Sequence, residues 1–199
     1  MNKDYKRDQN ASRYFQTVYK YLSATKVTDI KGKEVSLDEG ADQAVQMVLQ
    51  LLETTNKVML VGNGGSAALA SHTHNDLCKL VGVPSLVFTE APFLTALAND
   101  NGYIVAFEQQ VDLWAKPGDL LIAISSSGRS ENILRAAQAA RGHGCGLITI
   151  SGFQPENPLH FLGDLNFYVP IEDYGYVESA HSVLLHFFTD RAIILKNVR

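Results

Sequence analysis

The feature that most constrains the fold of this chain is an alternation of short apolar runs and helical segments from Lys57 onward. Each run is too short for a buried helix and is rich in β-branched or large apolar residues, which is typical of strands buried on both faces. The runs are VMLV (58–61), SLVF (85–88), LLIAI (120–124), LITI (147–150) and NFYV (166–169). The pattern therefore predicts five strands inside one sheet.

Helical periodicity separates these runs, near residues 67–80, 92–98, 104–115, 130–142 and 177–196. A strand, a helix and a further strand of the same sheet form a right-handed crossover, and a series of crossovers builds a parallel sheet between helices. The fold class that we predict is α/β, a three-layer doubly wound sandwich with a five-stranded parallel sheet.

Two amphipathic helices are predicted before this alternation begins. Their apolar stripes are made by Tyr14, Phe15, Val18, Tyr21 and Leu22, and by Ala44, Val45, Val48, Leu51 and Leu52. A turn-rich stretch at 28–34 separates them, and Ser36 forms a capping box with Glu39 before the second. We expect one domain over residues 1–199, in which an N-terminal helical extension (1–56) joins a complete core (57–199). Because exposed apolar stripes are unfavourable in a monomer, we expect oligomerisation.

The charge and the cysteine content limit the kinds of binding partner and the cellular compartment that we expect for this protein. The net charge of −4 and the absence of a Lys/Arg-rich face argue against nucleic acid as a partner. Neither a signal peptide nor a run of ~20 apolar residues is visible, so we expect no membrane association and a cytoplasmic protein. Cys78 and Cys145 are far apart and form no CxxC motif, so we expect two free thiols in a reducing compartment.

A glycine-rich motif, VGNGGS (Val61 to Ser66), is placed where the first of these strands should end and a helix should begin. Glycine allows tight turns and close approach of the backbone to a ligand, and the free N–H groups of a helix N-terminus attract anions. The motif matches neither the dinucleotide-binding nor the P-loop pattern. It indicates a site for phosphate or sugar hydroxyls, or else a turn that needs glycine for backbone reasons alone.

A serine-rich motif, SSSGRS (Ser125 to Ser130), follows the third run and precedes another predicted helix. Hydroxyls and backbone amides at a helix N-terminus form an uncharged cradle for phosphate, whereas ordinary capping needs only one serine. Ligands of open α/β sheets bind beyond the carboxyl ends of the strands, where both motifs fall. Their agreement favours phosphate binding.

Two further groups carry metal-ligating or acid–base side chains. His72 and Asp76 are one helical turn apart, which suits a metal, an acid–base pair or simply a solvated polar face. The last helix carries Glu178, His181 and His186. An acidic residue in its first turn would also suit the helix dipole. Eight residues of straight helix rise ~12 Å, so Glu178 and His186 can share an ion only if the helix starts after Glu178 or a neighbouring subunit completes the site.

The chain resembles the SIS (sugar isomerase) domain family, and within it phosphoheptose isomerases. The resemblance rests on GNGGS (62–66), ISSSGRSENIL (124–134) and the alternating pattern, and it covers about Val58 to the C-terminus with the two leading helices in outline. It implies the SIS fold, a sugar-phosphate substrate and a homotetramer with sites at subunit interfaces.

The resemblance also implies roles for individual residues. His72, Asp76, Glu178 and His186 would surround a divalent metal, zinc in the family, and the reacting carbons. Asp76 would be the general base and His186 the acid. Gly128 belongs to the phosphate loop, and the expected substrate-binding residues are Asn63, Gly64, Gly65, Ser66, Asn99, Asp100, Ser125, Ser126, Ser127, Ser130 and Glu178.

Two of these positions depart from the family pattern. Asp76 stands where the family has glutamate, and misplacement of a reacting group by about 1 Å can cost ~100-fold in rate. Glu178 stands where the family has glutamine, which adds a negative charge. These departures leave three readings open.

The favoured reading is an aldose–ketose isomerase that interconverts sedoheptulose 7-phosphate and D-glycero-D-manno-heptose 7-phosphate through an enediol. The second is an isomerase of another sugar phosphate, and the third is a non-catalytic phosphosugar-binding module that acts as a regulator. The four potential metal ligands favour an enzyme over the third reading.

Overall fold

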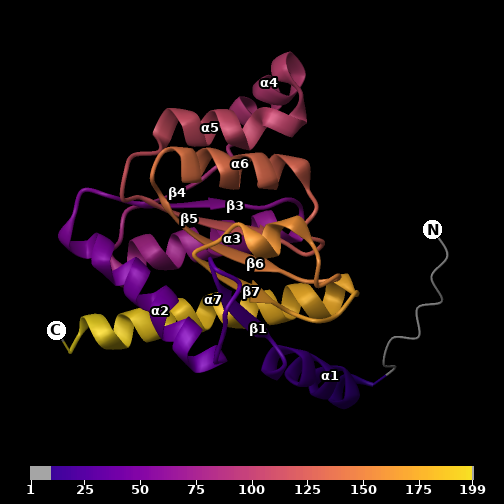
Figure 1. The fold of residues 1–199 in the computed structure, drawn as a ribbon. Coiled ribbons are helices and arrows are strands. Elements are labelled where there is room, and N and C mark those ends of the chain that lie inside the picture. The colour runs from indigo at the N-terminus through magenta and orange to yellow at the C-terminus, as the bar shows by residue number, and fades with distance from the viewer. Residues whose placement is uncertain (1–9, 199) are drawn as a thin grey trace.

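A seven-stranded sheet between two layers of helices organises the chain in this computed structural model, which describes residues 10–198 (Figure 1). The strands are β1 (Lys26–Asp29), β2 (Glu34–Val35), β3 (Val58–Val61), β4 (Ser85–Val87), β5 (Leu120–Ser125), β6 (Gly146–Ser151) and β7 (Leu165–Tyr168). The α-helices are α1 (Ala11–Ser23), α2 (Leu37–Leu49), α3 (Gly65–Asp76), α4 (Ala91–Asn101), α5 (Ala106–Trp114), α6 (Glu131–Gly142) and α7 (Tyr174–Lys196). Short 3₁₀ turns lie at Gln50–Glu53, Tyr103–Val105 and Pro158–Phe161, and a π-helical turn (Leu77–Val81) continues α3.

The strand order is β2-β1-β7-β6-β5-β3-β4. The five strands from β7 to β4 are parallel to one another, which confirms the predicted α/β class and places every predicted apolar run in the sheet. The strand count was wrong by two, because the hairpin β1–β2 adds an antiparallel edge, with Val27 opposite Phe167.

The missed hairpin occupies the stretch predicted to be only a turn. The Asp29 carboxylate accepts hydrogen bonds from the backbone N–H groups of Lys31 and Lys33, and Gly32 has φ +74°. A tight turn of this kind joins two strands as readily as it separates two helices. Pairing of β1 with β7, which lies far along the chain, decides between these outcomes.

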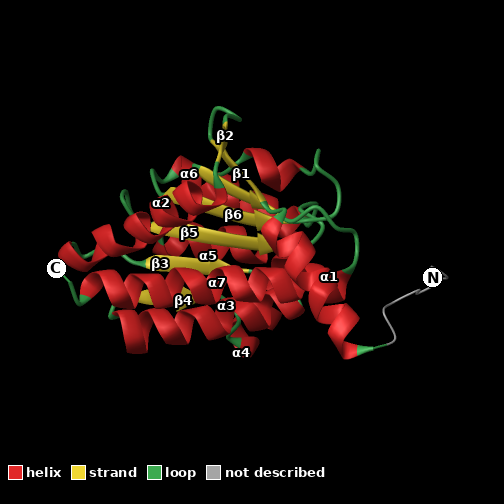
Figure 2. Ribbon diagram, turned by 90° about the horizontal axis from the view of Figure 1, so that it is seen from below, coloured by secondary structure: helices red, strands yellow, loops and turns green. Residues whose placement is uncertain are grey.

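Hydrophobic side chains alternate along each central strand and feed two separate cores. In β3, Val58 and Leu60 face the core covered by α2, α3 and α7, whereas Met59 and Val61 face the core covered by α5 and α6. Figure 2 shows α2, α3 and α7 in front of the strands. The expected three layers are therefore present, and β3, β5 and β7 are buried along their whole length.

The N-terminal segment is part of the sandwich, so the idea that residues 57–199 form a complete core by themselves was wrong. Val27 of β1 and Val45 of α2 are fully buried in the larger core. Ser36 caps α2 as predicted, with its hydroxyl accepting the Glu39 N–H at 3.2 Å. Only α1 remains peripheral, since it packs on α7 without a fully buried residue.

The last helix starts earlier than its periodicity predicted. It begins at Tyr174, because the Asp173 carboxylate caps it by accepting the N–H groups of Gly175 and Tyr176. It then runs without a break to Lys196 beside α3. Over the described residues, no helix combines the length and the hydropathy that a bilayer crossing requires.

Candidate active site

The glycine-rich and serine-rich loops meet at the carboxyl edge of the sheet. They follow β3 and β5, which are adjacent parallel strands, so the loops lie next to each other. Between them is a cavity of about 110 Å³. Its lining residues are Asn63, Ser66, Ile124, Ser125, Ser126, Ser127, Ser130, Tyr174 and Glu178. The two predicted motifs therefore line one cavity.

The serine loop is built tightly around Gly128. Its N–H donates to the backbone oxygen of Ser125 at 3.0 Å and to the hydroxyl of Ser125 at 3.2 Å. Gly128 has φ +62°, and a Cβ at this position would lie 1.8 Å from Oδ1 of the buried Asn157. Only glycine fits both the backbone conformation and the space.

Over residues 10–198, the cavity wall offers hydrogen-bond donors but no basic side chain. Ser126 is 5% exposed, and its hydroxyl is buried without a hydrogen-bond partner among the described residues. A buried hydroxyl without a partner is costly unless a ligand satisfies it. Ser127, Ser130 and the N-terminus of α6 lie nearby, so the cavity suits the oxygens of a small anion such as phosphate.

Glu178 adds a carboxylate to the same cavity. A Cβ built on Gly65, the first residue of α3, would lie 2.5 Å from its Oε2, so the carboxylate packs directly over the start of that helix. Burial raises the pKa of the Glu178 carboxyl above its usual value. The negative end of this side chain and an anionic ligand would therefore be close neighbours.

A second cluster lies farther along the same two helices. The Asp76 Oδ2 is 3.4 Å from Nε2 of His72 and 3.8 Å from Nδ1 of His186. The two imidazole rings are 4.9 Å apart, and one ligand atom from each of the three residues lies within 4.8 Å of the others. A small cavity of about 10 Å³ adjoins them.

This cluster has the donor chemistry of a metal site. Two imidazole nitrogens and one carboxylate oxygen match the ligands of catalytic zinc sites, which leave a position open for water or substrate. The Asp76 side chain is 11% exposed, whereas those of His72 and His186 are about half exposed, so the site opens to solvent from the histidine side.

Glu178 does not join this cluster within one chain. Because α7 begins before Glu178 and is unbroken, the explanation that the helix starts after Glu178 was wrong. The explanation that Glu178 sits in the first turn for the helix dipole was wrong too, since that turn has no acidic residue. Completion by a neighbouring subunit stays a prediction.

The structure leaves other predicted residues outside the cavity. Asn99 and Asp100 lie at the exposed end of α4, where the Asn99 amide donates to the Asp100 carboxylate at 2.8 Å. Neither lines the cavity described above, and neither do Gly64, the N-cap of α3, and Gly65, its first residue. Within one chain, therefore, only part of the predicted site is assembled.

His181 has a structural environment. It is fully buried, and its Nε2–H donates to the backbone oxygen of Ser151 at the end of β6, at 3.1 Å. Burial lowers the pKa of the imidazole to about 4, so it is neutral at pH 7. This hydrogen bond holds α7 against the end of β6, at a point on the helix between Glu178 and His186.

Sequence reasoning missed Tyr174, which lines the cavity. Its ring packs edge-on against Phe153 at 4.9 Å, and Phe153 has φ +60°, the one non-glycine residue with positive φ among residues 10–198. It also missed Asn132, whose place in the first turn of the helix after the serine loop was the available signal.

These observations define a class of protein. It is an α/β sandwich with a cavity suited to phosphate at the carboxyl edge of the sheet and a cluster of possible metal ligands farther along α3 and α7. The sequence profile of the SIS domain matches residues 14–152. The phosphoheptose isomerase of Aliarcobacter butzleri is 36% identical over 157 residues, which cover 76% of this chain and 82% of that protein. That of Helicobacter hepaticus is 35% identical over 166 residues, covering 79% and 83%.

Solved structures agree with these sequences. The phosphoheptose isomerase GmhA of Neisseria gonorrhoeae superposes with a TM-score of 0.78 at 27% identity, covering 91% of this chain and 95% of that chain. The chain belongs to the phosphoheptose isomerase family of SIS-domain proteins, which confirms the resemblance inferred from the two loops.

Proposed function

We propose that this protein is a sugar-phosphate isomerase that interconverts sedoheptulose 7-phosphate and D-glycero-D-manno-heptose 7-phosphate. The observation that carries the proposal is the placement of the two clusters along the neighbouring helices α3 and α7. From Ser66 to His72 the helix rises about 9 Å, and from Glu178 to His186 about 12 Å. An open seven-carbon chain spans about 8 Å between its terminal carbons. A phosphate held by the serine loop therefore leaves the other end of the sugar near the His/Asp cluster.

The serine cavity would hold the phosphate. Hydroxyl groups of Ser126, Ser127 and Ser130, with the free N–H groups at the start of α6, would donate to its oxygens. Asn63 and Ser66 would contact the sugar hydroxyls nearest to it. A chain of six carbons would fit nearly as well, and the names of the relatives favour the heptose.

Asp76 and His186 would carry the proton transfers. The Asp76 carboxylate takes the proton from C1 of the ketose, and the electrons of that C–H bond form the C1=C2 bond of the enediol. His186 gives a proton to the oxygen on C2. The Asp76 proton then returns to C2, while the C1 hydroxyl gives its proton back to His186 and becomes the aldehyde, so both residues are restored and the reaction needs no external oxidant or reductant.

His72, Asp76 and His186 would hold a divalent metal, which we propose to be zinc. When bound, the ion would polarise the substrate oxygen that accumulates charge in the enediol. Glu178 would supply a fourth ligand only to a neighbouring subunit, and only if it left the serine cavity of its own chain. Mixed nitrogen and oxygen donors also accept manganese or nickel, so metal analysis of the purified protein decides the identity.

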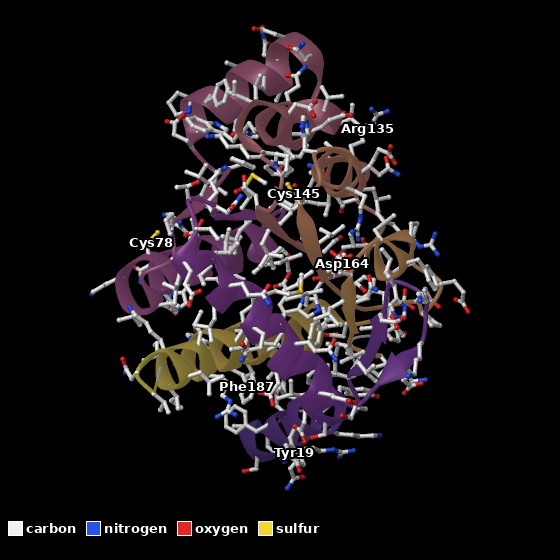
Figure 3. All side chains as sticks on the ribbon, turned by 60° about the vertical axis from the view of Figure 1, so that its left-hand side comes forward. Tyr19, Cys78, Arg135, Cys145, Asp164 and Phe187 are labelled. Atoms are coloured by element: carbon white, nitrogen blue, oxygen red, sulfur yellow. The ribbon has the colours of Figure 1, made fainter. Side chains whose placement is uncertain are left out.

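We further propose a cytoplasmic homotetramer of this single domain. Phe15 and Tyr19 on α1 are 66% and 71% exposed, and Phe187 on α7 is 45% exposed. Figure 3 shows Tyr19 and Phe187 toward the same end of the molecule. Burial of these side chains against a second copy would remove exposed apolar surface and bring α7 of one subunit toward another.

The test is an isomerase assay on the purified protein with sedoheptulose 7-phosphate, after chelation and with or without added zinc. Metal-dependent formation of the aldose supports the reaction, the substrate and the metal together. A folded protein without turnover that phosphosugars still stabilise against heat would instead support the non-catalytic module or an isomerase of another sugar.

A further inference from the structure

A reciprocal pair of side-chain amides joins the two loops that form the cavity. Asn63 lies in the glycine-rich loop after β3, and Asn132 lies in the first turn of α6 after the serine loop. Asn63 Nδ2 donates to Asn132 Oδ1 at 2.9 Å, and Asn132 Nδ2 donates to Asn63 Oδ1 at 3.0 Å. Asn132 is only 5% exposed, whereas Asn63 is partly buried, so the pair is shielded from water on the Asn132 side. The two loops are therefore held in register by side chains as well as by the strands beneath them.

A third segment locks the orientation of this pair. Tyr103, in the 3₁₀ turn before α5, donates its hydroxyl proton to Asn63 Oδ1 at 2.6 Å. The tyrosine ring rests edge-on against Phe107, with ring centroids 6.0 Å apart. Because Tyr103 and Asn132 both donate to the same oxygen, a rotation of the Asn63 amide by 180° would require both partners to reorient.

The hydrogen-bonding capacity of Asn63 shows what remains for a ligand. An amide oxygen has two acceptor lone pairs, and both are engaged, by Asn132 and by Tyr103. An amide nitrogen has two N–H groups, and one of them is engaged by Asn132. Asn63 lines the cavity, so its side chain retains a single N–H donor there and no acceptor.

We propose that Asn132 and Tyr103 are positioning residues, which hold Asn63 as a hydrogen-bond donor toward an acceptor oxygen of the bound sugar phosphate. The inference rests on the proposed phosphosugar function and adds the direction of one hydrogen bond. Without the two partners, the amide can turn and present its carbonyl oxygen, which repels phosphate oxygens and can only accept a hydrogen bond from a sugar hydroxyl.

The loss expected from one neutral hydrogen bond is about two- to tenfold in affinity. Tyr103→Phe removes only the hydroxyl and keeps the ring against Phe107, so it should weaken sedoheptulose 7-phosphate binding by this factor. Asn132→Ala should weaken binding at least as much. Asn63→Ala removes the donor itself, so Tyr103→Phe should have almost no further effect in that background.

The experiment is a double-mutant cycle of Tyr103→Phe and Asn63→Ala, with dissociation constants measured by calorimetry for sedoheptulose 7-phosphate and for inorganic phosphate. Tyr21→Phe, on the side of α1 that packs against the larger core, serves as the matched control for loss of a tyrosine hydroxyl. Thermal unfolding of each variant shows that it is folded. In turnover, KM should rise in Tyr103→Phe with little change in kcat, and a purely structural role would not produce this split.

The outcomes separate the inference from the proposed function. Binding to the wild-type protein with a Tyr103→Phe effect that disappears in Asn63→Ala supports the inference. Binding to the wild-type protein with no Tyr103→Phe effect, or with an equal effect in both backgrounds, overturns the inference alone. If the wild-type protein binds inorganic phosphate but not the heptose, the proposed substrate is wrong, and the dissociation constants for inorganic phosphate in the double-mutant cycle decide the inference. If it binds neither, both ideas fail.

Discussion

Gly128→Ala should both destabilise the protein and disable the serine loop. The first contribution comes from the backbone, because φ +62° costs an L-residue about 1–2 kcal/mol relative to glycine. The second comes from Asn157, whose Oδ1 would lie 1.8 Å from the new methyl group. No small adjustment accommodates such a distance, so the asparagine must move.

The cost of moving Asn157 follows from its hydrogen bonds. The side chain is fully buried, its amide donates to oxygens of residues 151, 152 and 154, and its Oδ1 accepts the N–H of His160. If two of these bonds are lost at about 1 kcal/mol each, the sum with the backbone term is about 3–4 kcal/mol. For a domain of this size, that lowers Tm by roughly 10 °C.

Urea unfolding of wild type, Gly128→Ala and Gly142→Ala measures the effect. Gly142 is the last residue of α6, and a Cβ there meets nothing within 4 Å. The same substitution at this site should therefore be neutral or stabilising by about 0.4–1 kcal/mol. Gly128→Ala should also lose phosphosugar binding at temperatures where it is folded. If Gly128→Ala unfolds at the same urea concentration as Gly142→Ala, the reasoning is refuted.

The remaining predictions concern four other side chains. Folding lowers the pKa of His181 from 6.5 to about 4, so the unfolded chain binds a proton that the folded chain does not. The free energy of unfolding should therefore fall by about 2 kcal/mol from pH 7 to pH 5. In urea unfolding, His181→Gln should flatten the dependence of this free energy on pH over that range. Phe153→Gly and Phe153→Ala both remove the ring, but only glycine accepts φ +60°, so the glycine variant should be more stable by about 1 kcal/mol, and equal midpoints would exclude backbone strain. Glu178→Gln removes a like charge beside the cavity and should tighten inorganic phosphate binding about fivefold in calorimetry, while weaker binding would show that the carboxylate helps. Asp76→Asn should abolish turnover and leave phosphosugar binding largely intact, and residual activity near wild type would remove Asp76 from its assigned role.

The central fold was predictable because its signals are local and redundant. The runs at β3 and β5 are buried on both faces, so they contain no polar residue to obscure the pattern, and a turn motif follows each of them. The hairpin β1–β2 has no such signal. Its strands contain four and two residues, they include Lys26 and Glu34, and their stability comes from pairing with β7 far along the chain.

The site was predictable to the extent that sequence neighbours remain spatial neighbours. Helical spacing alone places His72 beside Asp76, and strand adjacency places the two loops together. The contact of His186 with Asp76 depends on the packing of α7 against α3, which no local pattern specifies and which the family resemblance supplied. The hydrogen-bonded amides of Asn63 and Asn132 make another contact of this kind, between residues 69 positions apart in the chain.

The raised pKa of the Glu178 carboxyl bears on how this side chain and an anion would share the cavity. Burial raises the pKa of its carboxyl, so the side chain gains a proton more readily than an exposed glutamate does. A phosphate in the serine loop would raise that pKa further, because a nearby negative charge disfavours the ionised carboxylate. Binding of the anion and protonation of Glu178 therefore favour each other, and the hydroxyl of a protonated carboxyl is a hydrogen-bond donor. A protonated Glu178 would present the same kind of donor that the glutamine amide of the family pattern presents.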